Sequence, residues 1–409
     1  MHRVLTCALV ALVVLASSDD ASAQRRRRRP ARPPATTAPA TPTPTPTPTG
    51  RATVAQIAVG GDHSCARTTD GRVLCWGNDV VLTQIFPRTS ILGPRPTPTP
   101  LARVHDAQTL DMHGSQPVVR LAGDRLVSGG TWDIQRLGTV DHSPEDWRTD
   151  TLELASVPAQ TLVASAMGNT ICSIDPRGAL RCRGDNQFGQ LGAGSDVLAT
   201  EDWLTVPLTN VVSASHGGPS GCAITRDGAL HCFGRGLRGA LGDGASTERA
   251  RTPVRVVGIP SARAIAVSRE GHACAIATDG SVSCWGHARY GQLGSTPYDD
   301  TPTPRRVQLP GAATRIAVGR FFSCAIVSAE VHCWGAGNEG QLGDGRSQGS
   351  AIPVVVSSLD RVTDLSLGDA HACALRDDGS VWCWGRNTEG SCGVATGTDT
   401  SVPVRVPFP

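Results

Sequence analysis

The sequence predicts an all-β fold, a seven-bladed β-propeller whose blades are four-stranded antiparallel sheets. A pattern of about fifty residues recurs along the chain, and its clearest copy is His272 to Gly294, HACAIATDGSVSCWGHARYGQLG. Each clear copy holds two cysteines across a turn. The chain is also rich in glycine (46) and proline (29), which suits many short strands and tight turns. Four short strands in each of seven repeats are the pattern of a propeller.

The cysteines of this copy predict a β-hairpin closed by a disulfide. Cys274 and Cys284 flank Thr278-Asp279-Gly280, a three-residue turn in which the glycine takes the left-handed conformation. The cysteines then face each other at a non-hydrogen-bonded pair, where Cα atoms approach to roughly 4.5 Å, close enough for a disulfide. Nine residues also separate Cys65 from Cys75, Cys172 from Cys182, Cys222 from Cys232, and Cys373 from Cys383.

The sixth pair, Cys324 and Cys333, has eight residues between its members and lacks the turn glycine. A two-residue turn at Ser328-Ala329 restores direct opposition of the two cysteines. We therefore expect six disulfides, each adding roughly 2–3 kcal/mol by closing a small loop. Nine-residue spacing is unlike that of zinc-binding cysteines, and paired cysteines are typical of an oxidising compartment.

A degenerate blade is predicted between the first two cysteine pairs, because the interval between them is about twice the others. Val118 and Ser128 fall at its cysteine positions, around Ala122-Gly123-Asp124. This copy brings the number of repeats to seven.

The ends of the repeat region predict how the ring closes. Each unit has a strand like 253–256 (PVRV), a strand like 264–267 (AIAV), and then the hairpin. The first copy begins at 56–59 and lacks a convincing strand of the first kind, whereas 403–406 (PVRV) is such a strand with no hairpin after it. We expect the C-terminal strand to join the first blade, which closes the ring and removes its exposed edges.

The N-terminal segment, residues 1–23, is predicted to be a signal peptide. Arg3 precedes an apolar run from Val4 to Ala16, and Ala21-Ser22-Ala23 has the small-residue pattern of a cleavage site. The run is too short for a stable membrane anchor. We expect an exported protein, located in the periplasm, at the cell surface or outside the cell.

Residues 24–50 are predicted to be a disordered linker, and residues 51–409 the propeller. The linker begins with five arginines, Arg25 to Arg29, and continues as a proline- and threonine-rich tract that buries nothing. The first fifty residues hold seven arginines and two aspartates, so the rest carries 31 arginines against 34 acidic residues. Two readings of Arg25–Arg29 stay open, a solvated spacer and an electrostatic contact with an anionic envelope polymer or lipid.

The repeat resembles that of the regulator of chromosome condensation family. Residues 274–294 read Cys-Ala-Ile-x-x-Asp-Gly-x-Val-x-Cys-Trp-Gly-x-x-x-x-Gly-Gln-Leu-Gly, residues 324–343 are close to this string, and the resemblance covers about 52–409. Founding members of the family are nuclear exchange factors for a small GTPase that also bind nucleosomes. Its relatives include a plant ultraviolet photoreceptor and secreted bacterial inhibitors of β-lactamase. The resemblance implies a propeller, but the fold serves unrelated tasks.

The expected export of the protein and the charge of the propeller exclude some of the family's roles. An exported chain does not meet a nuclear GTPase, and a slightly acidic propeller lacks the basic footprint of nucleic-acid binding, so we expect no nucleic-acid partner. The absence of lysine excludes a Walker-type phosphate loop and Schiff-base catalysis. We expect a monomeric, noncatalytic binding or scaffold protein without a cofactor, whose partner is a protein or an envelope polymer. A glycan-active or other hydrolytic propeller is the alternative, and an exchange-factor-like role is a more remote one.

Three histidines, His63, His272 and His371, stand two residues before the first cysteine of their repeats. Histidines gathered around a channel could bind a metal, but a residue type at a fixed repeat position usually serves the repeat, so we expect no metal site. Aspartates of the hairpin turns are turn formers, and we assign no catalytic residues. Tryptophans that follow the second cysteine are expected to pack the blades.

Unrepeated residues are the candidates for partner binding. The loop 78–100 replaces the usual Gly-Gln-Leu-Gly turn and contains Phe86. Two inter-blade loops carry Trp147 and Trp203, each next to a glutamate and an aspartate, a combination that suits a contact on one partner-binding face. The alternative is that both rings pack against neighbouring blades. Cys392 replaces the leucine of Gly-Gln-Leu-Gly, and either fills that pocket or forms an intermolecular disulfide.

Overall fold

The computed structural model describes residues of the unit 51–409. These are residues 53–78, 94–101, 104–114, 116–123, 126–128, 150–152, 161–164, 170–395 and 397–409. The predicted signal peptide, the linker with Arg25–Arg29, Phe86 and Trp147 lie outside the described residues.

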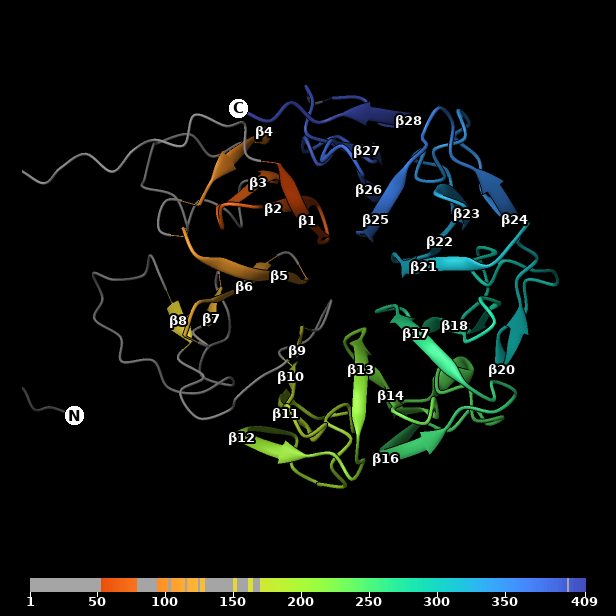
Figure 1. Ribbon diagram of the computed structural model, residues 1–409. Coiled ribbons are helices and arrows are strands. Elements are labelled where there is room, and N and C mark those ends of the chain that lie inside the picture. The colour runs from red at the N-terminus through yellow and green to blue at the C-terminus, as the bar shows by residue number, and fades with distance from the viewer. Residues whose placement is uncertain are drawn as a thin grey trace, which may run out of the picture. The chain divides into compact units, whose positions relative to one another are not determined.

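Seven four-stranded antiparallel sheets form seven blades around a central axis, which is the predicted fold class (Figure 1). Blades 1 to 3 contain β1 (Val54–Val59), β2 (His63–Thr68), β3 (Val73–Gly77) and β4 (Arg95–Pro100); β5 (Ala107–His113), β6 (Gln116–Leu121), β7 (Leu126–Ser128) and β8 (Asp150–Leu152); β9 (Thr161–Ala164), β10 (Thr170–Ile174), β11 (Leu180–Asp185) and β12 (Ala199–Thr205).

Blades 4 to 7 follow the same order. They contain β13 (Val211–His216), β14 (Ser220–Thr225), β15 (Leu230–Arg235) and β16 (Arg249–Arg255); β17 (Ala262–Val267), β18 (His272–Ala277), β19 (Val282–Gly286) and β20 (Thr301–Arg306); β21 (Ala313–Val318), β22 (Phe322–Val327), β23 (Glu330–Gly335) and β24 (Ser350–Val355); β25 (Val362–Leu367), β26 (His371–Arg376), β27 (Val381–Gly385) and β28 (Thr400–Arg405). A 3₁₀ turn, η2 (Leu237–Gly239), lies between β15 and β16.

The prediction that the C-terminal strand completes the first blade is wrong. β28 pairs with β27 and is the outer strand of blade 7, while blade 1 has its own outer strand, β4. β4 was not expected from the sequence because every second residue of Arg95–Pro100 is proline. Proline is tolerated in a strand that needs hydrogen bonds on one side only, as an outer strand does. Each blade therefore begins with its inner strand and ends with its outer strand, which contains Pro-Val-Arg in blades 4 and 7.

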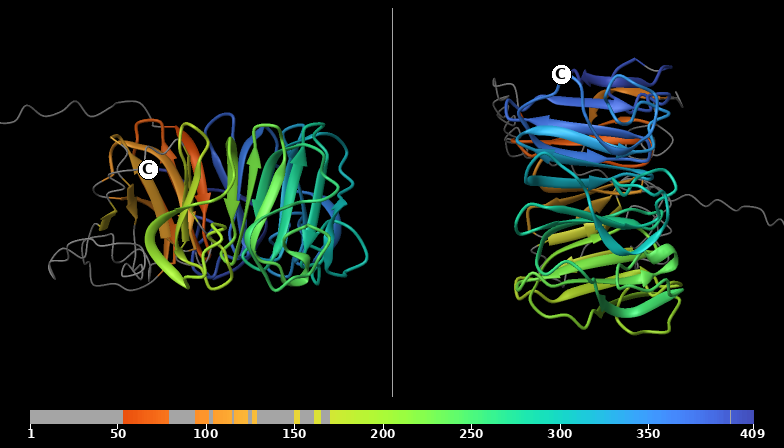
Figure 2. Two further views of the ribbon diagram at one scale, coloured as in Figure 1. Left: turned by 90° about the horizontal axis from the view of Figure 1, so that it is seen from below. Right: turned by 90° about the vertical axis from the view of Figure 1, so that its right-hand side faces the viewer.

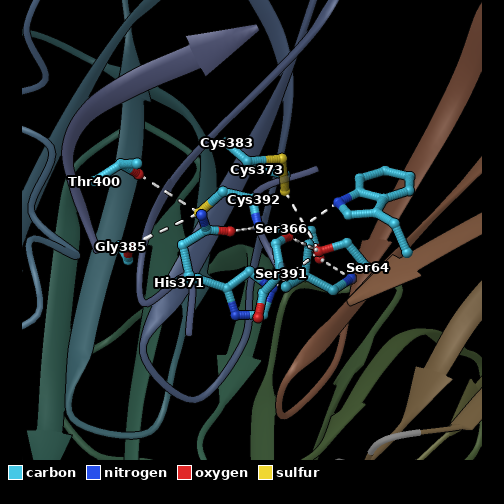
Figure 3. Close-up of a disulfide and its surroundings, with 12 residues drawn as sticks. Ser64, Ser366, His371, Cys373, Cys383, Gly385, Ser391, Cys392 and Thr400 are labelled. Atoms are coloured by element: carbon cyan, nitrogen blue, oxygen red, sulfur yellow. Dashed lines mark hydrogen bonds between the residues drawn. A yellow bond between two sulfur atoms is a disulfide. The ribbon is translucent and has the colours of Figure 1, made fainter. Parts of the chain in front are cut away.

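The seam between blades 7 and 1 is held by side chains instead of a shared sheet. Ser64 of blade 1 lies 2.9 Å from His371 Nε2 and donates from its hydroxyl to the Ser391 carbonyl (3.1 Å; Figure 3). The Trp76 indole donates to the same carbonyl at 2.9 Å. Apolar side chains of both blades surround these bonds in one buried cluster. The seam thus has the character of an ordinary junction between neighbouring blades.

The apolar core lies between the blades. Six buried clusters of described residues each draw side chains from two neighbouring blades. Tryptophans on the third strands cross these junctions, and their indole N–H groups donate to a carbonyl in the preceding blade: Trp285 to Ala240, Trp334 to Gln292 and Trp384 to Gln341, at 2.9–3.1 Å. The Gly-Gln-Leu-Gly turn therefore supplies the hydrogen-bond acceptor for the tryptophan of the next blade.

The last glycine of that turn lies against the tryptophan ring, and the carbonyl of the turn's second residue accepts the hydrogen bond from the indole. Gly294 has φ +72°, and a Cβ there would lie 3.0 Å from Trp334 Nε1, so glycine is required. In blade 4, Phe233 replaces the tryptophan and cannot donate a hydrogen bond. His216 Nε2 takes over and lies 2.9 Å from the Gln190 carbonyl.

Six disulfides join the second and third strands of six blades, in the pairs expected from the spacing. Cys274 and Cys284 are direct partners in the strand register, with Cα atoms 4.1 Å apart. All twelve sulfurs are buried, with at most 2% of each residue exposed. The disulfides therefore belong to the cores between blades.

The predicted two-residue turn of blade 6 is confirmed. Val327 pairs with Glu330, and the residues between them, Ser328 and Ala329, have φ values of 51° and 65°. Two positive φ values define a type I′ turn, which favours Asn-Gly. Residues other than glycine lose about 1–2 kcal/mol in this conformation.

Replacing Ser328→Asn together with Ala329→Gly should raise the free energy of unfolding by about 1 kcal/mol, because the turn is kept and its strain is relieved. Chemical denaturation of the two proteins measures the difference. The opposite change at a turn that has its glycine, Gly379→Ala at φ 76°, should destabilise the protein. A double variant that is no more stable than the parent would contradict the strain argument.

The degenerate blade also has the predicted register. Val118 pairs with Ser128, as the cysteines pair in the other blades. Val118→Cys with Ser128→Cys should therefore form a seventh disulfide and raise the free energy of unfolding by roughly 2–3 kcal/mol. Mass spectrometry after alkylation under non-reducing conditions counts the free thiols, and Val118→Cys alone is the control. Two alkylated thiols in the folded double variant would show that the register is different.

Cys392 fills the leucine pocket of blade 7. The residue is fully buried, and its thiol lies 3.5 Å from Thr400 Oγ1 (Figure 3). Burial raises the pKa of this thiol to about 12, so the thiol is protonated and unreactive at neutral pH. An intermolecular disulfide at Cys392 requires this pocket to open first.

Candidate functional site

A basic recess of about 380 Å³ lies on the propeller face that carries the loops between first and second strands and between third and fourth strands. We call it the arginine recess. It is lined by residues 219–220 and 235–240 of blade 4, residues 269–271 and 287–290 of blade 5, and Phe321 of blade 6. Its loops come from three consecutive blades, which lie side by side in Figure 1. The opposite face carries the hairpin turns between second and third strands, and Figure 2 shows loops gathered at both faces.

Local turn chemistry places Arg269 and Glu270 at the edge of the recess. They are the central residues of a turn in which Gly271 N donates to Ser268 O at 3.3 Å, and Gly271 has φ +85°. The Ser268 hydroxyl is buried and donates to the Gly319 carbonyl of the next blade at 2.9 Å. The turn is therefore fixed to the scaffold and presents its two charged side chains in a defined place.

Four guanidinium groups line the recess, against a single carboxylate, that of Glu270. Arg235 and Arg289 are exposed, and neither makes an ion pair within the described part of the chain. Arg238 Nη1 lies 3.9 Å from Asp300 Oδ2, a distance at which an exposed pair contributes little. Arg269 is engaged at 2.6 Å by Asp369. The recess therefore presents an excess of positive charge.

Aromatic rings form the other part of the recess. Tyr290 is 42% exposed, and its ring centroid lies 4.5 Å from that of Phe321. Phe321 is in turn covered by the Arg320 guanidinium, 5.0 Å from the ring centroid. Arg320 is held by Glu270 at 2.9 Å. Such a combination of arginine and exposed tyrosine is typical of the energetically important residues of protein interfaces.

His287 is a buried polar side chain of the recess whose ring makes no hydrogen bond within the described residues. It is 6% exposed. Burial, with a smaller effect of the Arg238 charge, lowers its pKa. The imidazole is therefore neutral at pH 7, with one donor and one acceptor nitrogen.

Ion pairs join different blades on the same face as the recess. Arg269 of blade 5 reaches Asp369 of blade 7, and Arg386 of blade 7 reaches Asp62 of blade 1 at 3.5 Å and Glu339 of blade 6. Burial raises the pKa of Asp369, while the Arg269 charge opposes that rise. These carboxylates are thus paired with arginines, whereas Arg235 and Arg289 of the recess make no ion pair within the described residues.

Trp203, predicted to lie in an inter-blade loop, lies instead in β12, the outer strand of blade 3. Its ring is half-buried beneath the Arg183 guanidinium, whose carbon is 4.8 Å from the ring centroid. The loop prediction is therefore wrong, because Trp203 and the two acidic residues before it belong to one strand. Since Trp147 and Phe86 lie outside the described residues, the shared partner-binding face stays a prediction.

The three histidines of the repeat are buried between neighbouring blades. His272 Nε2 lies 3.1 Å from Ser323 Oγ, and His371 makes the same contact with Ser64. Neither ring nitrogen of His63 makes a hydrogen bond within the described residues, since blade 2 has Pro117 at the position where blades 1 and 6 have Ser64 and Ser323. Within the described part of the chain, no three histidine, cysteine or acidic side chains gather as a metal site would require.

Sequence reasoning missed the recess because its residues stand in a turn assigned to the scaffold. One signal was available. The residue just before the first glycine of the Gly-Gln-Leu-Gly turn changes from blade to blade: Phe188, Arg238, Tyr290, Glu339 and Glu389. A variable, large or charged residue inside a repeated turn indicates an exposed position that the repeat does not need.

The sheets and their loops define a β-propeller that presents a basic recess on one face. Models of the regulator of chromosome condensation (RCC1) repeat match residues 54–80, 263–292 and 362–391, and also 279–326, 328–375 and 378–409. The chain is an RCC1-repeat β-propeller. No curated protein matches it in sequence.

Solved structures share the fold at low identity. Prp20p of Saccharomyces cerevisiae is 17% identical with a TM-score of 0.69, over 87% of each chain. The same yeast protein bound to Kap60 gives 16% identity and a TM-score of 0.71, over 87% of this chain and 85% of that one. The ectodomain of the Arabidopsis thaliana receptor kinase ACR4 is 16% identical with a TM-score of 0.51, over 87% of this chain and 100% of that one. These likenesses concern the fold alone.

None of the described helical segments has the length and apolar character that a membrane crossing requires.

Proposed function

We propose that this protein is an exported, noncatalytic binding protein that takes a protein partner on the face with the arginine recess. The observation that carries the proposal is the set of unpaired arginines beside the exposed Tyr290. Arginine and tyrosine are enriched where interfaces gain most of their binding energy. A rigid propeller supports the loops, so little ordering is needed when a partner binds.

Two further observations support the proposal. The yeast RCC1-repeat protein with this fold binds other proteins, since its structures concern Gsp1p, histones and Kap60. The six disulfides are typical of proteins that mature in an oxidising compartment, which agrees with the predicted signal peptide.

The proposal is tested by affinity capture from envelope and culture-medium fractions with the mature protein. A photo-crosslinking residue in place of Tyr290 should label a partner protein, whereas the same residue at Asp227, on the opposite face, should not. Charge reversal at the recess, Arg235→Glu with Arg289→Glu, should reduce capture at least tenfold. The matched control is Arg177→Glu with Arg226→Glu in two hairpin turns of the opposite face. Equal capture by both double variants would overturn the proposed binding face.

A further inference from the structure

We infer that the arginine recess recognises an acidic segment of polypeptide that carries an aromatic or large apolar side chain next to its carboxylates. This inference rests on the proposed function and names the chemistry of the partner. It follows from three properties of the described recess: its unpaired charge, its exposed aromatic surface, and the opposite charge balance of the remaining propeller.

The charge selects carboxylates. Arg235 and Arg289 make no ion pair within the described residues, and Arg238 has only the 3.9 Å contact with Asp300. Arg269, in contrast, is held by Asp369 at 2.6 Å. A guanidinium offers a planar pair of donors that matches the two oxygens of a carboxylate. Arg235 ends β15 of blade 4, and Arg289 follows β19 of the neighbouring blade 5, so the recess can bind two acidic side chains of one short segment.

The apolar part selects a side chain next to those carboxylates. Tyr290 and Leu237 are 42% and 39% exposed at the recess, and Phe321 lies against Tyr290. An aromatic ligand side chain stacked here removes this surface from water. His287, neutral and without a hydrogen-bond partner, is available to a peptide N–H or C=O group. A main chain supplies both kinds of group.

The remaining propeller disfavours a long polyanion. Residues 51–409 carry 34 acidic residues against 31 arginines, so an extended anionic glycan meets net repulsion outside the recess. At the axial mouth beside the recess, Asp369 already holds Arg269, so this pair attracts a polyanion little. A short acidic segment can contact the recess without crossing the axial mouth.

Isothermal titration of the full mature protein with capped peptides tests the inference. The probe has two glutamates, one aspartate and one phenylalanine. Its amide counterpart carries glutamine and asparagine at the acidic positions, and a third peptide has alanine for phenylalanine. The acidic probe should bind with one-to-one stoichiometry, and the amide peptide roughly tenfold more weakly or worse. Arg289→Glu should reduce affinity for the acidic probe about tenfold, and Tyr290→Ala should abolish the preference for phenylalanine over alanine. Arg226→Glu is the control.

Equal affinity for the acidic and amide peptides would overturn the inference. A heparin fragment that binds more tightly than the acidic probe, and is weakened equally by Arg289→Glu, would overturn the peptide class in favour of a glycan. If recess variants abolish partner capture but the acidic probe does not compete with the partner, the proposed function stands and the inference fails. If the probe binds the recess while partner capture is unchanged by the variants, the proposed function fails.

Discussion

Lowering the pH from 7 to 5 is expected to reduce the free energy of unfolding by roughly 6 kcal/mol, about 2 kcal/mol for each of three buried histidines. Burial lowers the pKa of His63, His272 and His371 to about 3 in the folded protein. In the unfolded chain a histidine has a pKa near 6.5. As the pH falls, the unfolded state therefore binds protons at a higher pH than the folded state does. Stability is therefore full above pH 6.5 and is lost as the pH falls from 6.5 toward 3.

Three other histidines add to this loss of stability at low pH, and one aspartate opposes it. The pKa values of His231, His287 and His332 are also lowered by burial, so these residues act in the same direction. Burial raises the pKa of Asp369, which acts in the opposite direction as a single group. Chemical denaturation at half-unit pH steps measures the slope, and a flat profile between pH 7 and 5 would contradict the role of the histidines.

A variant of His63 isolates one third of the effect. Blade 6 has the buried Phe322 at this repeat position, so His63→Phe uses a side chain that the repeat already accommodates. The change removes a buried imidazole without hydrogen bonds, and should stabilise the protein by about 1–3 kcal/mol at pH 7 and by more at pH 5. His63→Leu is a smaller second variant, and His105→Gln at an exposed position is the control. An unchanged pH slope in His63→Phe would show that His63 does not contribute to it.

Replacing Trp76→Ala should reduce the free energy of unfolding by about 3–5 kcal/mol, because a fully buried indole at the ring seam is lost. Trp76 packs edge-on against Phe408, with ring centroids 5.8 Å apart, and donates to the Ser391 carbonyl. Since none of the described strands is shared between blades 7 and 1, such contacts hold the ring closed.

The matched control is Trp334→Ala at an internal junction, where the indole donates to the Gln292 carbonyl at 2.9 Å. Denaturation should give losses of similar size for the two variants, because seam and internal junction have the same construction. A loss below about 1 kcal/mol in Trp76→Ala alone would show that other contacts close the ring.

The local parts of the fold were predictable because their contacts lie close together in the sequence. Facing cysteines are separated by at most ten positions, so spacing alone indicates the hairpin, the turn at Ser328-Ala329 and the register of Val118 with Ser128. The candidate site was not predictable in this way. Arg238 and Phe321 belong to loops of different blades, and each looks like part of a scaffold turn when its own repeat is read alone.

By itself, the sequence determined the number of repeats, the hairpin in each and the pairing of the cysteines, because strand pairing over ten residues follows from periodicity and turn chemistry. Only the tertiary structure decided that β28 stays in blade 7, that Trp203 lies in a strand, and that arginines of blades 4 and 5 share one recess. These outcomes depend on how the ring curves and brings together loops about fifty residues apart, a distance over which local patterns carry no information.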